Sequence, residues 1–356
     1  MDKKRLLYIM GIDWEWIYQR PQILAEKLAQ DYEVTVVFPR SILQRRKARR
    51  IVEQFKMHIL WTLPYQEKNA FIGKLAFWMN HKIFHNIKTF DLIYVGYPLY
   101  ARYIPQDYKG MIIYDCMDNH EALYPDQKRV GKVLQQEQRL VQYCDLLIVS
   151  ARKLQKKMDF IAGYKKSVLI RNGMMLRDTL EIKKSVVRQN YDICYIGTIS
   201  EWFDEETVRK SLAEVPNIQY QLIGPGRATI ENERVTYHGT IAHDKLGQTI
   251  EAYDCLVMPF KVNEIVASVD PVKLYEYIAF GKCIVSVFYE EIERFGDFVY
   301  FYKDADEYIA LLKELSEKGF PPKYTAEQQK EFLNNSTWES RYQILRSQIL
   351  AKEDKK

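Results

Sequence analysis

The sequence predicts two doubly wound, parallel α/β domains arranged in tandem. Short strand-like runs recur at regular intervals and are separated by stretches of helical periodicity. Most of these runs are continuously apolar, which is typical of parallel strands buried on both faces. The alternation occurs twice along 356 residues, a length sufficient for two domains of ordinary size.

The order of the elements suggests where each domain begins and ends. The first series of strand-like runs occupies residues 5–10, 33–39, 58–63, 92–98, 111–118, 146–151 and 167–173. The second series occupies residues 191–199, 218–224, 234–239, 255–260, 283–288 and 298–303. We therefore expect an N-terminal domain over 1–173, a polar linker at 174–190 and a second domain over 191–323. The tail 324–356 has helical periodicity, and we expect it to pack back on the N-terminal domain.

The composition is that of a globular protein, with 47% hydrophobic and 28% charged residues. No apolar run approaches the roughly 18–20 residues needed to span a bilayer. The first residues read as a β-strand rather than a signal peptide. Five cysteines lie in or beside strand-like runs without a CxxC pair, namely Cys116, Cys144, Cys194, Cys255 and Cys283. This pattern predicts buried, reduced thiols and a cytoplasmic protein.

No metal or cofactor site is expected. His81 and His85 are four residues apart on a predicted helix, but no third ligand lies nearby in the sequence. Asp304 and Asp306 have the spacing of a metal-binding acidic dyad, yet they follow the last predicted strand of the second domain.

The segment SVDPVKLYEYIAFGK (268–282) predicts a short helix with distinct start and stop signals. Asp270 suits the N-cap, Pro271 the first helical position, and Gly281 a left-handed end. Lys273 and Glu276 are three residues apart and share one face. The simplest alternative is a capped surface helix with one weak ion pair.

The ends of the predicted strands are where ligands bind in doubly wound sheets. Gly197 and Thr198 directly follow a strand, and glycine there lets backbone N–H groups approach an anion. Neither GxGxxG after the first strand nor GxxxxGK[ST] is present, which argues against a nicotinamide dehydrogenase and a P-loop ATPase. A helix beginning at Asp270 could hold a diphosphate at its positive end, with Lys273 nearby and Glu276 accepting ribose hydroxyls. The sequence thus predicts a nucleotide site.

Several motifs, taken together, resemble one family. IRNG, YIGTI, LIGPG, YHGT, CLVMPF and SVDPVKLYEYIAFGK occur in the order seen in family-four-like glycosyltransferases of the GT-B fold. WEWIYQRPQ (14–22) and YDCMD (114–118) resemble the branch with bacterial teichuronic-acid and exopolysaccharide glycosyltransferases. The resemblance covers nearly the whole chain and is strongest over 191–290.

The resemblance implies two Rossmann-like domains facing across a cleft and transfer of a sugar from a nucleotide diphosphate sugar. It implies that Glu276 binds the nucleotide ribose, Lys273 lies near the diphosphate, Gly197 approaches the phosphates and Gly239 lies near the base. Many members carry a second glutamate eight residues before the ribose-binding one, where this chain has Ser268. Retention or inversion at the sugar therefore stays open.

The N-terminal half is expected to bind the acceptor. Trp14, Arg20 and Gln22 are predicted at the rim of the cleft, because aromatic rings stack on sugars and arginine binds phosphate. The alternative is that Trp14 and the nearby Trp16 pack against the neighbouring domain. Asp118, beyond the fifth strand, is the candidate base for the acceptor hydroxyl, and an Asx turn or N-cap is its structural alternative.

The net charge of +5 is unevenly distributed. Residues 1–90 carry 16 Lys and Arg against 8 Asp and Glu, whereas the remainder carries 36 against 39. The run 44–50 is strongly basic, and 68–88 mixes aromatic side chains with lysines and histidines. Such stretches suit an anionic membrane surface, while a solvated face and nucleic acid are alternatives.

These observations predict a cytoplasmic glycosyltransferase bound peripherally to the inner face of the plasma membrane. It would move a sugar from a UDP-sugar to a saccharide or lipid-linked saccharide during synthesis of bacterial cell-surface polysaccharide, with no cofactor and no nucleic-acid partner. Two other classes stay open: a nucleotide-sugar epimerase of the same architecture, and a non-catalytic sugar-binding scaffold.

Overall fold

The computed structural model describes residues 3–44, 55–124, 127–163, 166–174 and 179–354. The chain divides into two compact units. The N-terminal unit comprises Met1–Asn172 together with Trp338–Lys356, and the C-terminal unit comprises Gly173–Thr337.

A seven-stranded parallel sheet forms the centre of the N-terminal unit. Its strand order is β3-β2-β1-β4-β5-β6-β7. The strands are β1 (Arg5–Ile9), β2 (Glu33–Ser41), β3 (Lys56–Thr62), β4 (Leu92–Val95), β5 (Met111–Cys116), β6 (Leu146–Val149) and β7 (Val168–Leu169). Every residue of β4, β5 and β6 is buried, as their continuously apolar runs predict.

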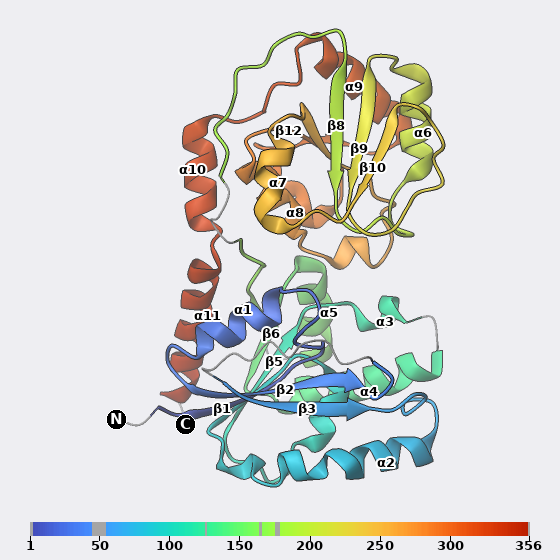
Figure 1. Cartoon of the computed structure of the whole chain (residues 1–356). Helices are drawn as coiled ribbons and strands as arrows, with labels where there is room; N and C mark the ends of the chain where they lie inside the picture. The colour runs from blue at the N-terminus through green and yellow to red at the C-terminus, as the bar shows by residue number, and fades with distance from the viewer. Residues whose placement is uncertain (1–2, 45–54, 125–126, 164–165, 175–178, 355–356) are drawn as a thin grey trace. The chain divides into compact units, whose positions relative to one another are not determined.

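Helices cover both faces of this sheet. They are α1 (Arg20–Leu28), α2 (Ala70–Asn80), α3 (His120–Leu123), α4 (Gln127–Tyr143), α5 (Arg152–Ala162) and α11 (Trp338–Glu353), with 3₁₀ turns η1 (His81–Phe84), η2 (Ile87–Thr89) and η3 (Pro98–Tyr103). Figure 1 shows α1 and α11 along one face and α2 along the other. This is the doubly wound arrangement.

The C-terminal unit repeats the architecture with six parallel strands in the order β10-β9-β8-β11-β12-β13. The strands are β8 (Tyr191–Ile196), β9 (Ile218–Ile223), β10 (Val235–Gly239), β11 (Cys255–Met258), β12 (Cys283–Val287) and β13 (Tyr300–Tyr302). The helices are α6 (Glu205–Glu214), α7 (His243–Ile250), α8 (Val272–Ala279), α9 (Ala305–Glu317) and α10 (Ala326–Asn335), with 3₁₀ turns η4 (Val266–Ser268) and η5 (Glu290–Phe295).

The fold-class prediction of two parallel α/β domains is confirmed. Each of the thirteen predicted runs overlaps one of the described strands. In both units the second and third strands lie on one side of the first strand, and the fourth lies on its other side. The chain therefore reverses its winding direction between β1 and β4, and again between β8 and β11.

The segment expected to be a linker belongs instead to the C-terminal unit. The Leu180 N–H donates to the Ala279 carbonyl at 2.9 Å. The backbone of Val186 passes so close to Gly319 (φ +73°) that a Cβ there would lie 2.8 Å from it. The segment is thus packed along this unit at Leu180 and at Val186.

The tail also departs from the expectation of one helical stretch. It breaks between α10 and α11, where Met174 pairs with Thr337 and the Met174 N–H donates to the Ser336 carbonyl. Consequently α10 belongs to the C-terminal unit and α11 to the N-terminal unit. α11 packs on α1 and buries one stripe of side chains, consisting of Trp338, Tyr342, Leu345 and Ile349.

All five cysteines are buried free thiols, as the sequence predicts. Among the described helices, none combines the length and apolar character required to cross a bilayer.

Candidate active site

The switch point of the C-terminal sheet lies between β8 and β11. In open α/β sheets, ligands bind beside the carboxyl ends of the strands at such a point. The loop after β8 begins at Gly197, the loop after β11 contains Phe260, and the latter chain segment leads into α8. These three elements define the candidate donor site.

Lys273 lies directly on the backbone of Gly197. A Cβ at Gly197 would be 2.1 Å from Lys273 Cε and 2.7 Å from its Nζ, and the φ of Gly197 is +143°. The Lys273 ammonium also lies 5.7 Å from the centre of the Phe260 ring. Only glycine permits this approach, so the fold brings two of the predicted donor residues together.

The charge of Lys273 is poorly compensated within the protein. Burial lowers the pKa of its ammonium, and the Glu276 carboxylate opposes that shift. No ion pair to Lys273 occurs among the described residues. Glu276 is half-buried, one turn further along α8. A bound anion would supply the missing counter-charge. A half-buried cation at a strand end therefore favours the binding of an anion.

Gly197 and Thr198 both make contacts within the C-terminal unit. The Gly197 N–H donates to the Ile223 carbonyl at 2.8 Å, so this amide is not available to a phosphate. A Cβ at Gly224 (φ +140°) would lie 2.0 Å from the Gly197 carbonyl oxygen, so the two loops pack backbone to backbone. Thr198 is half-buried and its carbonyl accepts from the Tyr195 hydroxyl at 2.9 Å. The Gly197 amide is therefore used within the protein, and the donor contacts predicted for Gly197 and Thr198 stay predictions.

Gly239 ends β10 in the left-handed region at φ +67° and is exposed. Its carbonyl accepts from the Gly224 N–H at 2.7 Å, which joins the ends of β9 and β10. No heavy atom of the described residues lies within 4 Å of the place of a Cβ. Its position near a base stays a prediction.

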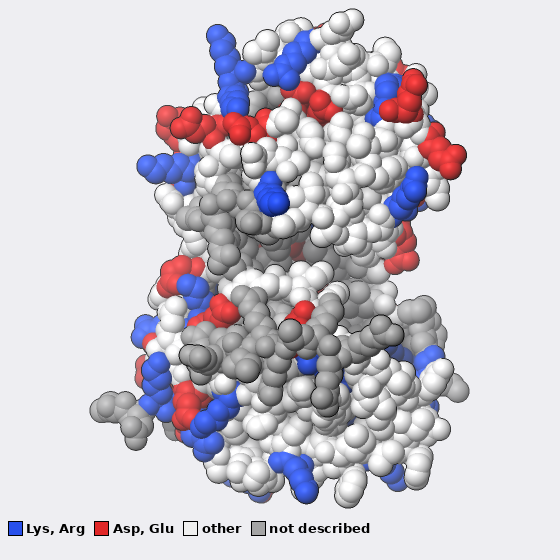
Figure 2. Space-filling model, in the orientation of Figure 1, with Lys and Arg blue, Asp and Glu red and all other residues white. Residues whose placement is uncertain are grey.

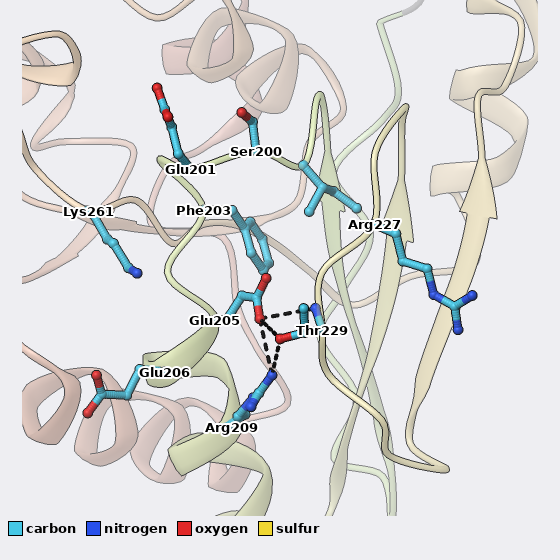
Figure 3. Close-up of a pocket in the computed structure, with 10 residues that line it drawn as sticks. Ser200, Glu201, Phe203, Glu205, Glu206, Arg209, Arg227, Thr229 and Lys261 are labelled. Atoms are coloured by element: carbon cyan, nitrogen blue, oxygen red, sulfur yellow. Dashed lines mark hydrogen bonds and ion pairs between the residues drawn. The ribbon is translucent and has the colours of Figure 1, made fainter. Parts of the chain in front are cut away.

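A pocket of about 380 Å³ opens at this same edge of the C-terminal sheet. It is lined by residues that follow β8, β9 and β11 and by the first turns of α6. Figure 3 shows its central network, in which Glu205 accepts from the Thr229 hydroxyl at 2.6 Å and from Arg209 at 3.1 Å. Arg227 and Lys261 add positive charge. Sequence reasoning missed this pocket, because only the Glu205–Arg209 spacing is visible locally.

A second pocket, of about 350 Å³, lies at the switch point of the N-terminal sheet. Its walls come from the ends of β1, β2 and β3 and from the loop after β4. Gly11 packs tightly there, since a Cβ would lie 3.1 Å from the Gly96 carbonyl oxygen. Tyr97 packs edge-on against Tyr100 at 5.2 Å. We call this the strand-end pocket; its side chains include Tyr65, Tyr97, Tyr100, Tyr124 and Arg129.

The chain was also compared with known proteins. No family model matches the chain. Over 240 residues it is 23% identical to a Bacillus subtilis (strain 168) protein named "Putative teichuronic acid biosynthesis glycosyltransferase TuaH". The alignment covers 61% of this chain and 60% of that protein.

Solved structures match over nearly the full length. Sucrose-phosphate synthase from Thermosynechococcus elongatus superposes with a TM-score of 0.74 at 14% identity, over 98% of this chain and 100% of that one. The Anabaena protein Alr3699/HepE in complex with UDP-glucose gives 0.70 at 14% identity, over 98% and 99%. The lipopolysaccharide outer core galactosyltransferase WaaB gives 0.66 at 12% identity, over 98% and 99%.

The fold is that of the GT-B glycosyltransferases.

Within this GT-B chain, Asp270 is neither the cap of α8 nor a ligand-facing group. It is fully buried, pairs with Arg294 and accepts from the Tyr275 hydroxyl at 3.0 Å. Pro271 occupies the N-cap and the helix begins at Val272. The expectation of a capping, donor-binding Asp270 is therefore wrong, because the carboxylate instead ties the loop before α8 to η5.

Ser268, at the place of the family's second glutamate, is also buried. Its hydroxyl donates to the Glu264 carbonyl at 2.7 Å, which joins the end of η4 to the loop that precedes it. The side chain is used to hold the backbone.

Arg20 does not offer its guanidinium to an acceptor. Its Nε and Nη2 bind both carboxylate oxygens of Asp115 at 3.0 and 2.8 Å, and its Nη1 donates to the Ile170 carbonyl at 2.8 Å. The group is buried, so the predicted acceptor contact is wrong. Arg20 instead joins the start of α1 to the end of β5, where a buried ion pair with full hydrogen bonding is tolerated.

Trp14 and Gln22 are likewise internal. Trp14 is buried, with its ring edge-on to Phe55 at 5.5 Å. The Gln22 amide donates to the carbonyls of Trp14 and Ile17, each at 3.2 Å. These side chains shape the loop before α1 rather than contact an acceptor, which corrects both predictions. Trp16, on the same loop, is 61% exposed.

Asp118 lies two residues past β5 and is half-buried. Burial raises the pKa of its carboxyl, the Asp115 carboxylate raises it further, and Arg20 opposes both. A raised pKa makes a carboxylate a better proton acceptor. Its catalytic role stays a prediction.

His120, which the sequence analysis missed, begins α3 just beyond Asp118 and is buried. Burial lowers the pKa of its imidazole to about 4, so the ring is neutral near pH 7. Neither ring nitrogen has a hydrogen-bond partner among the described residues, and Nε2 lies 3.9 Å from Glu137. An unsatisfied polar ring in such a place suits a group that meets a ligand.

The residues with metal-like spacing in the sequence, Asp304, His81 and His85, do not form a metal site among the described residues. Asp304 caps α9 by accepting from the Glu307 N–H at 2.9 Å. His81 and His85 are exposed. Across the part of the chain that the structure describes, no group of three or more His, Cys, Asp and Glu side chains could hold a metal ion.

Proposed function

We propose that this chain is a glycosyltransferase that moves a sugar from a UDP-sugar to a saccharide or lipid-linked saccharide. The observation that carries the proposal is Lys273, which lies half-buried and without an ion pair among the described residues, against Gly197 at the switch point of the C-terminal sheet. The GT-B fold and the name of the Bacillus subtilis relative support the reaction class. The Alr3699/HepE structure, solved with UDP-glucose, supports the donor class.

The donor end of the reaction follows from charge. Cleavage of a nucleotide sugar leaves negative charge on the diphosphate, and a fixed cation stabilises that charge. Lys273 and the amino end of α8 supply positive charge at one place. Glu276, one turn further on, accepts hydrogen bonds from the two ribose hydroxyls.

The acceptor end is assigned to the N-terminal unit. The strand-end pocket offers tyrosine rings, which stack on sugar faces, in place of the three buried residues that the sequence suggested. Asp118 takes the proton of the acceptor hydroxyl if the anomeric centre inverts. If the centre is retained, the departing phosphate takes that proton and Asp118 orients the acceptor.

The biological setting is proposed by analogy with the relatives' names. Teichuronic acid and lipopolysaccharide core are bacterial cell-surface polysaccharides, and the two relatives are named for their synthesis. We place this chain at the cytoplasmic face of the plasma membrane, acting on a saccharide that grows there.

The donor site is tested with Lys273→Ala and Glu276→Ala. Each variant is expected to lose transfer by about 100-fold or more, because Lys273→Ala removes the cation at the diphosphate and Glu276→Ala removes the acceptor for the ribose hydroxyls. UDP should raise the melting temperature of the wild-type protein by several degrees and that of the variants much less. The matched controls are Lys318→Ala and Glu314→Ala, an exposed Lys–Glu pair at the C-terminal end of α9. Full activity in either site variant would falsify this donor site.

The same assay separates the two other classes. Conversion of a UDP-sugar to its epimer without acceptor would identify an epimerase. No thermal shift with UDP, GDP or their sugars would identify a non-catalytic scaffold.

A further inference from the structure

Helix α2 presents its apolar side to solvent. Phe71, Leu75 and Trp78 are 76%, 42% and 75% exposed, and they lie at positions i, i+4 and i+7, one face of the helix. Lys74 shares that face and is also exposed. A surface helix ordinarily turns such a stripe toward the core. An exposed apolar stripe of this kind marks a surface that binds something.

The orientation of α2 is fixed by specific hydrogen bonds. The Asn69 side chain caps the helix by accepting from the N–H groups of Phe71 and Ile72. At the other end, the buried Asn80 side chain accepts from the Trp61 N–H at 2.9 Å and donates to the Trp61 carbonyl at 2.8 Å. These contacts hold Ala76 and Asn80 against β3, so the Phe71–Trp78 stripe necessarily faces outward.

The charge around the stripe has one sign. Residues 69–90 contain three lysines and two histidines and no acidic residue. Of the three lysines, Lys88 is paired with Asp107. In Figure 2, the part of the displayed face over α2 is white and blue. Exposed apolar rings set among cations fit an anionic lipid surface better than nucleic acid, which offers no apolar layer to receive the rings.

A pocket of about 340 Å³ adjoins α2. Three cationic side chains line it: Lys74, Arg102 and Lys132. Phe77 forms one wall and is stacked on Tyr103 with ring centres 5.0 Å apart. The pocket's acid, Glu67, is already paired with Arg129.

Arg102 has donors that the protein does not use. Among the described residues its Nε lacks a hydrogen-bond partner, and its Nη2 makes only a long contact of 3.4 Å with the Tyr103 hydroxyl. A guanidinium with spare donors beside two lysines is suited to a phosphate group.

We propose that α2 docks on an anionic bilayer through its exposed apolar face, and that the adjoining pocket binds the phosphate of a lipid headgroup. This inference rests on the membrane location proposed above, and the partner that it adds is an anionic lipid surface. Lys74 belongs both to the exposed face and to the pocket, so one lipid can be held by its headgroup while the rings enter the bilayer. The pocket that adjoins α2 shares Gln66 and Glu67 with the strand-end pocket. A lipid phosphate bound in it therefore lies beside the proposed acceptor site.

The docking face is tested by co-sedimentation with phosphatidylcholine vesicles, with and without phosphatidylglycerol. The full chain is expected to bind only the anionic vesicles. Phe71→Ala and Trp78→Ala should each weaken the partition coefficient by about tenfold, because each removes a large ring from the bilayer. The matched control is Phe160→Ala, which removes an 88% exposed ring from α5 of the same unit. An equal loss in the control would overturn the assignment of α2.

The pocket is tested with Lys74→Gln and Arg102→Gln. Each should weaken binding to the anionic vesicles by about fivefold, the effect of one cation near such a surface. Lys156→Gln, an exposed lysine of α5, is the control. Equal losses in all three variants would mean diffuse attraction and would overturn the pocket. If inorganic phosphate stabilises the protein and vesicles do not bind, the pocket is a site for soluble anions. That result would overturn the proposal of a lipid headgroup.

Failure of this inference is distinguishable from failure of the donor site. Thermal stabilisation by UDP should be the same in the wild type and in all α2 and pocket variants, because those residues lie in the N-terminal unit. A chain that UDP stabilises but that binds no anionic vesicle would overturn the membrane proposal and leave the donor site standing.

Discussion

At the scale of single residues, the predicted charged side chains differ in whether they form ion pairs within the protein. Arg20 and Asp270 are buried in ion pairs with Asp115 and Arg294. Lys273 has no such partner among the described residues, although burial lowers the pKa of its ammonium. A protein that keeps such a group without an internal counter-charge favours an anionic ligand at that place.

The lowered pKa of Lys273 predicts that UDP binding weakens at alkaline pH. Only the protonated lysine attracts the diphosphate, and in the free protein it loses its proton below the ordinary value of 10.5. The dissociation constant should therefore rise as the pH passes through this lowered pKa. Titration calorimetry at increasing pH measures it.

The Lys273→Met variant is the control for this pH dependence. It should bind UDP weakly at all pH values and show only the changes caused by titration of UDP itself. An identical alkaline loss in the wild type and in Lys273→Met would show that Lys273 does not contact the phosphates.

At the scale of elements, α11 illustrates how a distant segment completes a domain. Its buried stripe covers α1, and the Tyr342 hydroxyl and Arg346 guanidinium bind the Asp31 carboxylate at 2.6 and 2.8 Å. Burial would raise the pKa of Asp31, but the hydrogen bonds from Tyr342 and Arg346 lower it overall. Since the folded-state pKa lies below the ordinary one, this contact stabilises the docked helix above that ordinary value and is lost as the pH falls through the lowered pKa.

We expect Leu345→Ala to destabilise the protein by about 2–5 kcal/mol, because it removes a fully buried side chain between α11 and the rest of the N-terminal unit. The neighbouring Ile344→Ala, at a 40% exposed position, should change stability by roughly 0.5 kcal/mol or less. Urea denaturation of the two variants measures the difference. Equal effects would mean that α11 is not docked through this stripe.

At the scale of the whole molecule, the two units have separate cores and separate proposed tasks. The proposed donor residues lie in the C-terminal unit, and the strand-end pocket and α2 lie in the N-terminal unit. Both units use the same strand order, and both carry a pocket at the carboxyl ends of their strands. The repeated topology therefore predicts the edge of each sheet at which a ligand binds.

Hydrogen exchange in the presence of UDP tests this division. Amides in 197–203 and 260–276 should exchange more slowly with UDP bound, because a ligand stabilises the loops that it contacts. Amides in the strands of the N-terminal sheet should exchange at the same rate with and without UDP, because UDP does not contact them. Protection centred on the loops after β1 and β4, with none at 260–276, would assign the nucleotide to the other unit.

The sequence by itself determined the strands, their parallel arrangement and the fold. Continuous apolar runs such as those of β4 and β11 are stable only when both faces of the strand are buried. The local sequence is therefore enough to predict a strand inside a parallel sheet. It also proposed Lys273 and Glu276 as donor-site candidates, since both belong to a single short helix; their role stays a prediction.

Only the tertiary structure decided which polar side chains are free to act. Arg20 meets Asp115 from 95 residues away, and Asp270 meets Arg294 from 24, so no local pattern reveals that their charges are already used. The pockets likewise arise from loops of neighbouring strands that are distant in sequence. Whether a charged group binds a ligand or its own protein depends on the nearest opposite charge in space, and folding alone sets that distance.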